Sequence, residues 1–469
     1  MSPNPDRPLT EAERFPLLNE GGRALLHRLL EHPQAPRYTF PCGDRLDAAG
    51  LAQVRAFREA LDREPRWMAD PERQERLEAF ADQCRQRVPF YRRYREVAKG
   101  FEQVPTCSRH DLHRAPWEFV PDDQTLDDLI VYHTTGTSGR KLQVYSHPVV
   151  SSQYLACLDW MLNREGIRLE GGPDRVAIIQ VCAQQSTYTH ATVASYLDQA
   201  GYVKINLNPH EWRASDDRWQ FLEDCAPQIL TGDPVAFLAL AASPVRLQPK
   251  ALVSSAMLLL PATRQALTQR FGCPVFDTWS LNEARLVAYS VRDGPLFPVA
   301  HDVFIEILDE AGRACPPGVR GEITLTGGRN PFLPLLRYRT GDYARMSEAA
   351  KGSLIEEFDG RSPVVFLDGQ GRVVNSIDVT GAMKRFPLAQ YALHQRVDRT
   401  LVMRMRGLGW DEKDVRETLR GLFGPDQIVT LERLEEDQTI GGKVIPYRCD
   451  LPEVSQGSAL PEFSWHVRG

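Results

Sequence analysis

Apolar positions follow a helical spacing in the first part of this chain. They recur every three or four residues, which places them on one face of a helix. The residues that mark this face are Leu51, Val54, Phe57 and Leu61, continued by Leu77 and Phe80. The chain is therefore expected to begin with helices.

From residue 129 onward, short apolar runs alternate with helical patterns. Such runs between turn-forming residues are typical of buried strands. Strands are expected at residues 129–132, 176–181, 229–230, 251–255 and 274–277, and helices at 149–166 and 261–271. Strands that alternate with helices predict a parallel sheet whose ligand site lies at the carboxyl ends of the strands.

The pattern changes again after about residue 295, where residues 303–308 and 322–325 alternate between apolar and polar. This alternation favours antiparallel sheet or a small barrel. A strand at 401–403, a helix at 411–423 and a strand at 428–431 then indicate a compact α+β unit. We therefore predict an α/β protein with two domains. Residues 1–360 would form parallel βαβ sheets with an antiparallel β subdomain, and residues 361–469 a small, mobile α+β domain.

Composition and charge narrow the class of protein. The chain has 469 residues, 42% hydrophobic and 25% charged, which is typical of packed globular domains. The net charge of −6 is spread over both halves and argues against a nucleic-acid surface. The nine cysteines form no CxxC pair, and no run approaches the roughly 20 apolar residues of a membrane span. A cytoplasmic protein without a signal peptide is expected.

A small, hydroxyl-rich loop follows the apolar run at 129–132. Its backbone N–H groups, hydroxyls and the cations just after it, Arg140 and Lys141, are the groups that hold a polyphosphate. A plain turn is the alternative interpretation. The loop consists of Thr134, Thr135, Gly136, Thr137, Ser138 and Gly139.

A second candidate motif spans residues 277–283, with the sequence DTWSLNE. Trp279 can stack on a nucleobase, and Glu283 can coordinate a hard cation such as Mg²⁺. Alternatively, Trp279 packs in the core and Glu283 is a surface acid.

Three further polar residues are candidates for binding the ribose or the phosphates of a nucleotide. Asp342 follows a Thr-Gly turn at the expected end of a strand, where it can accept both hydroxyls of a ribose, or merely cap the next segment. Arg361 lies at the expected domain joint, where it can reach the ribose or phosphates, or belong to a solvated linker. Lys443 follows two glycines and can neutralise a phosphate, or be an ordinary hairpin lysine.

In this order, the segments resemble the adenylate-forming superfamily of acyl-CoA synthetases, adenylation domains and luciferases, and within it the phenylacetate–CoA ligase branch. Residues 134–141 match the family's SSGTTGxP loop, and residues 279–283 its tyrosine-glycine-x-threonine-glutamate motif. Residues 301–342, with a Gly-Glu pair upstream of RYRTGD, match best. The resemblance covers residues 85–365 well and the last hundred poorly.

The resemblance implies that ATP activates a carboxylic acid to acyl-AMP, and that a thiol then takes the acyl group. The loop at 134–139 would hold the phosphates, Trp279 would stack on adenine, Glu283 would bind Mg²⁺ and Asp342 the ribose. Lys443 would bridge the attacking carboxylate and the phosphate or ribose oxygens. Lys443, Glu283 and Thr134 are thus the implied catalytic residues. The implied ATP or AMP contacts also include Ser255, Ala256, Asp277, Ser280, Asn282 and Arg361.

The chain also departs from the family pattern. Lys141 replaces the loop proline, and Ser280 and Asn282 replace a glycine and a threonine. Met257 stands where the branch usually carries glutamate, and Pro363 where an acidic hinge is expected. These departures bear on the rotation of the last domain and on catalysis.

Three functions stay open on the residues alone. The first is a CoA ligase, and the second an adenylation enzyme that loads the phosphopantetheine arm of an acyl or aryl carrier protein. The third is a catalytically degenerate protein that binds a nucleotide or an acyl-adenylate. Residues 184–190, QQSTYTH, are polar where the branch is glycine-rich. They favour a polar or hydroxylated aryl acid over a long fatty acid, with His190 either packed or an acid/base.

Overall fold

The structure is a computed structural model that describes residues 8–63, 72–134, 142–299, 302–349, 352–359, 364–435, 439 and 444–452. The chain divides into two compact units, and the division falls between Arg361 and Ser362. Leu260–Ala266 group with the second unit. None of the described helices has both the length and the apolar character that crossing a membrane requires.

An eight-stranded sheet forms the centre of the first unit, in the order β11-β10-β9-β8-β7-β4-β6-β5. The strands from β9 to β6 are parallel, whereas β5, β10 and β11 are antiparallel. The predicted parallel sheet is therefore confirmed in the middle, while its edges are antiparallel. The strands are β4 (Val176–Cys182), β5 (His190–Ala194), β6 (Ala200–Asn206), β7 (Ile229–Gly232), β8 (Ala251–Ser254), β9 (Val275–Leu281), β10 (Arg285–Ser290) and β11 (Phe297–Pro298).

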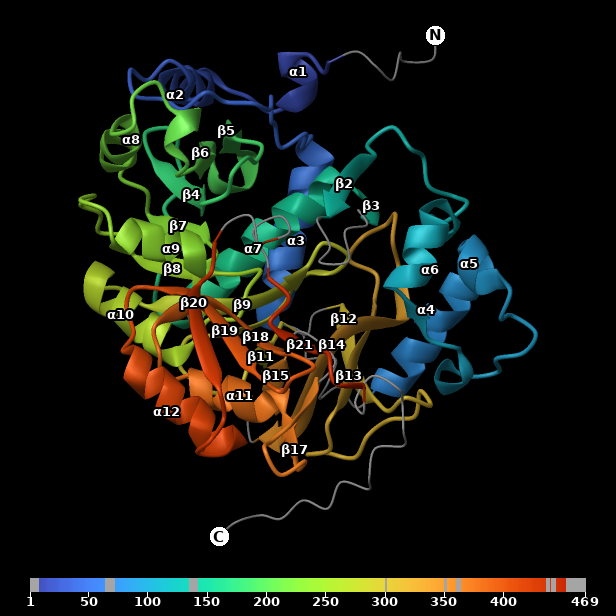
Figure 1. The fold of residues 1–469 in the computed structure, drawn as a ribbon. Helices are drawn as coiled ribbons and strands as arrows, with labels where there is room; N and C mark the ends of the chain where they lie inside the picture. Colours follow the sequence, from blue (N-terminus) through green and yellow to red (C-terminus); the bar gives the residue numbers. More distant parts are fainter. Residues whose placement is uncertain are drawn as a thin grey trace. The chain divides into compact units, whose positions relative to one another are not determined.

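Helices α3 (Ala48–Arg63) and α7 (Pro148–Arg164) lie side by side in the first unit (Figure 1). Both join one hydrophobic core with strand residues such as Ile178 and Val253, and the predicted helical face buries Val54 and Phe57 there. The other helices of this unit are α1 (Glu11–Arg14), α2 (Glu20–Leu30), α4 (Arg73–Arg87), α5 (Pro89–Arg92), α6 (Arg109–Arg114), α8 (Asp217–Cys225), α9 (Pro234–Ala241) and α10 (Pro261–Phe271), whose first residues group with the second unit.

A five-stranded sheet holds the RYRTGD segment, which ends at Asp342. Its order is β1-β14-β13-β12, with β15 paired to β14, and all pairs except β1 with β14 are antiparallel. The antiparallel pairing predicted after residue 295 is thus confirmed. The strands are β1 (Cys107–Ser108), β12 (Val303–Leu308), β13 (Gly321–Gly327), β14 (Leu335–Ala349) and β15 (Gly352–Asp359).

The apolar run at 129–132 is a strand, but the prediction that it is buried is wrong. It belongs to β2 (Ile130–Thr134), which pairs with β3 (Leu142–Ser146) in a separate two-stranded sheet. Val131 is 40% exposed. A hairpin outside the main sheet cannot cover both faces of its strands, so an apolar run there stays partly in solvent.

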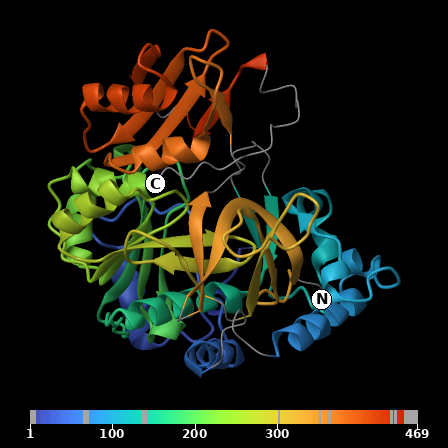
Figure 2. The same ribbon diagram turned by 90° about the horizontal axis from the view of Figure 1, so that it is seen from below.

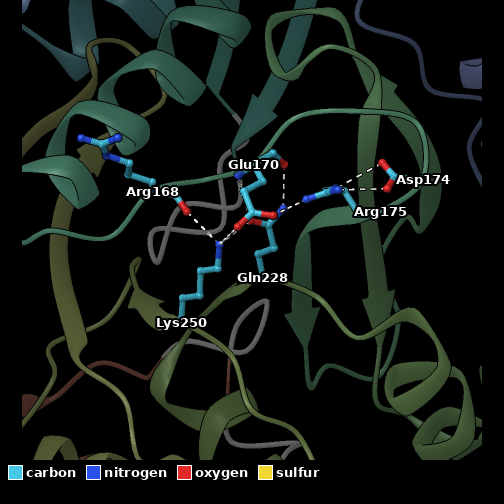
Figure 3. A network of polar contacts seen from close by, with 6 residues as sticks. All are labelled: Arg168, Glu170, Asp174, Arg175, Gln228 and Lys250. Carbon is cyan, nitrogen blue, oxygen red and sulfur yellow. Dashed lines mark hydrogen bonds and ion pairs between the residues drawn. The ribbon is translucent and has the colours of Figure 1, made fainter.

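A network of polar side chains joins the amino ends of three parallel strands (Figure 3). Arg175, Gln228 and Lys250 immediately precede β4, β7 and β8. The Lys250 ammonium lies 3.1 Å from the Glu170 carboxylate and donates to Gln228 Oε1 at 3.0 Å. Arg175 pairs with Glu170 and, at 2.9 Å, with Asp174. Glu170, Asp174, Arg175 and Lys250 thus each have an opposite charge beside them.

The second unit contains a four-stranded sheet in the order β20-β19-β18-β21, accompanied by α11 and α12 (Figure 2). The predicted strands and helix near residues 401, 411 and 428 are confirmed. The Asp411 side chain caps α12 by accepting from Lys413 N at 2.7 Å, and Gly424 ends the helix with φ of 109°. The elements are β16 (Val365–Leu367), β17 (Val373–Asn375), α11 (Ser376–Met383), β18 (Leu388–Gln395), β19 (Leu401–Gly407), α12 (Glu412–Phe423), β20 (Val429–Arg433) and β21 (Tyr447–Cys449).

Candidate active site

The carboxyl ends of the parallel strands bring predicted site residues to one edge of the main sheet. Gly232 on β7 is in register with Ser254 on β8, which is in register with Asp277 on β9. The chain then leaves β8 through Ser255, whose N–H donates to the Gly232 carbonyl at 2.9 Å. Ala256 has φ of 68° and is exposed. Ser255, Ala256 and Asp277 thus lie where a parallel sheet places its ligand.

Two motifs that are far apart in sequence meet at this edge. The Trp279 indole N–H donates to Asp342 Oδ2 at 2.8 Å, across a separation of 63 residues. The Trp279 ring lies 5.2 Å from that of Phe358 at an angle of 51°, and the residue is only 6% exposed. Trp279 therefore packs in the core and also orients the Asp342 carboxylate. Its stacking on adenine stays a prediction.

Asp342 owes its position to a bulge in β14. The Glu322 carboxylate accepts from Gly341 N at 2.9 Å and from Arg339 Nε at 2.6 Å. Thr340 Oγ1 donates to the Ile323 carbonyl at 2.8 Å, and Gly341 has φ of 81°, which glycine adopts without strain. The pairing of β13 with β14 shifts register here. The expected position of Asp342 at a strand end is therefore wrong, because Asp342 lies within β14 at a bulge that interrupts the regular pairing with β13.

Glu283 is buried, which excludes its interpretation as a surface acid. The Tyr338 hydroxyl donates to its Oε1 at 2.9 Å, and Arg109 Nη1 lies 3.8 Å from the same oxygen. Burial, followed by the charge of Glu283, raises the pKa of Tyr338 well above its usual value, so the phenol keeps its proton. The structure thereby links the motif of Glu283 to RYRTGD a second time.

The described residues contain no cluster of three or more metal-ligating side chains. Mg²⁺ is commonly held by one or two carboxylates, with substrate phosphates and water supplying the other oxygens. The buried Glu283 carboxylate fits that role, and the arginine beside it shows that this position favours a cation.

For several predicted site residues, the structure gives no contacts that test their roles. Residues 135–139, Arg361 and Lys443 lie outside the described part of the chain, and Thr134 is described only as the last residue of β2. Ser280 is half-buried and Asn282 is exposed. Their roles stay predictions.

Arg285, which stands two residues after Glu283, was not among the predicted site residues. Its guanidinium lies 4.4 Å from the ring centroid of Tyr132, and its Nη2 lies 3.4 Å from Ser146 Oγ. The Tyr132 hydroxyl is 2.7 Å from Ser151 Oγ. Arg285 therefore adds positive charge beside β2 and β3, which flank the hydroxyl-rich loop. An arginine shortly after the motif was the signal available.

A second missed cation is Lys204 in the middle of β6. It is 6% exposed, and its Nζ lies 3.4 Å from the ring centroid of Tyr188. His190 on β5 is directly paired with Lys204 and is equally buried. Burial, then the charge of Lys204, lowers the pKa of His190 to about 4. The sequence signal for this residue was a lysine inside an otherwise apolar strand. Only the structure shows that it lies in a cluster with Tyr188 and His190.

No family model matches the chain. It is similar to a phenylacetate-coenzyme A ligase of Pseudomonas putida, 32% identical over 89 residues, which are 18% of this chain and 20% of that enzyme. It is also similar to the phenylacetate-coenzyme A ligase of Aromatoleum evansii, 24% identical over 320 residues, covering 61% of this chain and 69% of that enzyme. The first match thus spans only a fifth of the relative's length.

In structure, the chain is similar to 2-hydroxyisobutyryl-CoA ligase in the postadenylation state with R3-HIB-AMP. The TM-score is 0.61 at 17% identity, over 83% of this chain and 92% of that chain. The same ligase with 2-HIB-AMP and CoA in the thioesterification state gives a TM-score of 0.51 at 17% identity, over 82% and 91%. The chain therefore has the fold of these ligases. Its resemblance to the adenylate-forming superfamily, in the phenylacetate–CoA ligase branch, is confirmed.

Proposed function

We propose that this chain is an AMP-forming acid–CoA ligase, which activates a carboxylic acid with ATP and transfers the acyl group to CoA. The observation that carries the proposal is the hydrogen bond from Trp279 to Asp342. It joins the two segments that the family resemblance assigns to adenine and ribose. The likeness to phenylacetate-coenzyme A ligases in sequence and the shared fold support the same conclusion.

In the first half-reaction, a carboxylate oxygen of the acid attacks the α-phosphorus of ATP. A bond forms between that oxygen and phosphorus, and the bond to the bridging oxygen of pyrophosphate breaks with its electron pair. The products are acyl-AMP and pyrophosphate. An anion that attacks a polyanion requires positive charge and alignment. We assign these tasks to the backbone and hydroxyls of residues 134–139 and to Lys443, with Asp342 holding the ribose.

Glu283 would hold Mg²⁺, which supplies charge neutralisation to the phosphates when bound. The Tyr338 hydroxyl donates to Glu283 Oε1 at 2.9 Å, and this hydrogen bond fixes the orientation of the carboxylate. Arg109, 3.8 Å away, keeps positive charge at the same place.

In the second half-reaction, the CoA thiol loses its proton and its sulfur attacks the acyl carbon. The bond from that carbon to the AMP oxygen breaks, and AMP leaves with the electron pair. Movement of residues 361–469 between the half-reactions stays a prediction, as does a location in the cytoplasm. The acid is a polar or hydroxylated aryl acid rather than a long fatty acid, because residues 184–190 are polar.

The test is ATP–pyrophosphate exchange over a panel of aryl and alkyl acids, followed by AMP release with CoA or with a pantetheinylated carrier protein. We expect exchange with at least one polar acid, and thioester formation with CoA. A carrier protein that is accepted in place of CoA would support the loading enzyme. Nucleotide binding without exchange on any acid would support the degenerate binding protein and contradict the proposal.

A half-reaction test addresses Lys443. The Lys443→Ala variant should lose exchange while it still forms thioester from preformed acyl-AMP, since the lysine is assigned to phosphate chemistry alone. Equal loss of both half-reactions would contradict this role.

A further inference from the structure

Lys204 is a buried cation to which the described residues supply no ion-pair partner. It lies inside β6 and is 6% exposed, and its Nζ lies 3.4 Å from the centroid of the Tyr188 ring. The acid whose charge still reaches it, Glu211, accepts from Asn206 Nδ2 at 2.6 Å instead. A buried charge without a counter-charge is costly, and proteins seldom retain one without a function.

The neighbour of Lys204 across the sheet is also unsatisfied. His190 is its direct partner on the antiparallel strand β5, so both side chains stand on one face. His190 is 6% exposed, and its Nδ1 has no hydrogen-bond partner among the described residues. Its ring stacks on Tyr188, with an interplanar angle of 11°. A buried ring nitrogen without a hydrogen-bond partner, beside a buried ammonium without a counter-charge, indicates a position for a ligand.

This cluster lies in the same sheet as the candidate active site. Lys204 is in register with Gln180 on β4, and β7 separates β4 from β8, which carries Ser254 at its end. Three strand spacings between β6 and β8 correspond to about 14 Å across the sheet. Tyr188 also lies near Tyr132 of β2, since that tyrosine contributes after burial to raising the pKa of Tyr188 to about 12. The cluster is thus within reach of an acid whose reacting carboxylate lies at the nucleotide.

We infer that Lys204, flanked by Tyr188 and His190, binds a second negatively charged oxygen group on the acid that is activated. This inference rests on the proposed function and names its substrate class. The acid is a dicarboxylic acid, or an acid with a comparably acidic second oxygen. Because of the separation across the sheet, the spacer is an aromatic ring or a chain of similar length, and malonate is too short.

The surroundings suit such a group. The Tyr188 ring holds the ammonium through a cation–π contact, which leaves its N–H groups on the other side for an anion. Burial lowers the pKa of Lys204, and a bound carboxylate would oppose that shift by favouring the charged form. His190, kept neutral by its lowered pKa, retains one ring N–H that can donate to the same oxygen.

The test compares acids that differ only at the far end, namely terephthalate with benzoate and 4-hydroxybenzoate, and adipate with hexanoate. Exchange kinetics are measured together with binding of each acid by calorimetry, for the wild type and Lys204→Met. We expect the ratio of kcat/KM for the dicarboxylate over the monocarboxylate to fall on the order of 100-fold in the variant. Lys204→Arg should retain part of the preference, because it keeps the charge.

The melting temperature of the Lys204 variant shows whether this residue recognises the substrate or only supports the fold. Methionine has similar length without the charge, so Lys204→Met should keep or raise the melting temperature. Lys250→Met removes a lysine from the opposite end of the sheet and should leave the ratio unchanged. A lower melting temperature with equal loss on both acid classes would overturn the inference.

The remaining outcomes distinguish the two proposals. Exchange on monocarboxylates with no dicarboxylate preference would overturn this inference and leave the ligase function standing. Calorimetric binding of dicarboxylates that depends on Lys204, without any exchange, would support the anion site and contradict the ligase function. A preference for 4-hydroxybenzoate over terephthalate would also overturn this inference, because a phenol with a pKa of about 10 carries no second negative charge near neutral pH.

Discussion

The eight-stranded sheet carries charged side chains at both ends, but in different settings. At the amino ends of β4, β7 and β8, Glu170, Arg175 and Lys250 pair with opposite charges in a largely exposed network (Figure 3). Toward the carboxyl ends, Lys204 and His190 are each 6% exposed, and His190 Nδ1 has no partner among the described residues. At the amino ends, each of these charges has an ion-pair partner within the protein. Toward the carboxyl ends, Lys204 has no ion-pair partner and His190 Nδ1 has no hydrogen-bond partner among the described residues.

This difference separates a structural network from a ligand site. Exposed ion pairs are screened by water and contribute little, so the amino-end network can be changed at small cost. Buried polar groups without partners reduce stability, and they are retained where a ligand completes them. The Trp279–Asp342 hydrogen bond is assigned to the ligand site and not to a structural network, because it positions a carboxylate instead of neutralising one.

Among the substitutions that test this difference, replacement of Asp342 is expected to have the largest effect on kcat/KM for ATP. Asp342→Asn should lower kcat/KM for ATP in the exchange reaction roughly 100-fold, because hydrogen bonds to a charged group are worth about 1.5–3 kcal/mol each and a ribose offers two hydroxyls. Exchange assays at varied ATP measure this. Asp426→Asn, at an exposed turn of the second unit, is the matched control and should behave as the wild type. A change below threefold at Asp342 would contradict ribose binding there.

A smaller effect is expected at Trp279. Trp279→Phe removes the indole donor to Asp342 and should raise KM for ATP about tenfold with less change in kcat. Trp212→Phe is the control, since Trp212 is also buried and donates at 2.7 Å, but to the Asn206 carbonyl. It should destabilise the fold comparably and leave KM for ATP unchanged. The idea fails if both variants alter KM equally.

The third prediction concerns pH. The pKa of His190 is about 4 in the fold, against a usual 6.5, because the buried ring disfavours its charged form. As pH falls below 6.5, the unfolded chain binds this proton first, so stability is lost between pH 6.5 and 4, by up to about 3 kcal/mol. His190→Gln should lack this part of the loss. Urea unfolding of both proteins at pH 7 and pH 5 measures the difference, and parallel profiles would contradict the assignment.

The smallest effect is expected at the opposite end of the sheet. Lys250→Met removes one cation from the exposed network and should lower the melting temperature by only about a degree. The difference should shrink further at high salt, because screening already weakens the pair. Calorimetric scans at low and high salt test this. A loss of exchange activity in this variant would contradict the division between the two ends.

The fold was largely predictable, and the reason differs between elements. The strands at 303–308 and 322–325 have alternating patterns, the helix at 261–271 lies between two apolar strands, and the structure confirms all three. The antiparallel strands β5, β10 and β11 at the two sides of the sheet were missed, because strand pairing depends on which strands meet, and the apolar period does not encode this. The burial expected at 129–132 failed for the same reason.

The site was predictable in its residue types and less so in its geometry. Motif spacing pointed to Glu283 and Asp342, but neither the bulge at Gly341 nor the phenol bonded to Glu283 is visible in one dimension. Lys204 is instructive. A single lysine in an apolar strand does not by itself indicate a binding site. The pairing of β5 with β6 places His190 beside it and thereby reveals the cluster.

The sequence by itself determined which segments are helix or strand, and which carry hydroxyls, carboxylates and glycines near turns, because backbone geometry and hydrophobic period are local. The tertiary structure decided which of these groups meet. It paired Trp279 with Asp342 across 63 residues, and it left Lys204 and His190 facing one another in the interior. Hydrogen bonds and the cost of a buried charge depend on distance and on the surrounding medium, and only the folded chain defines both.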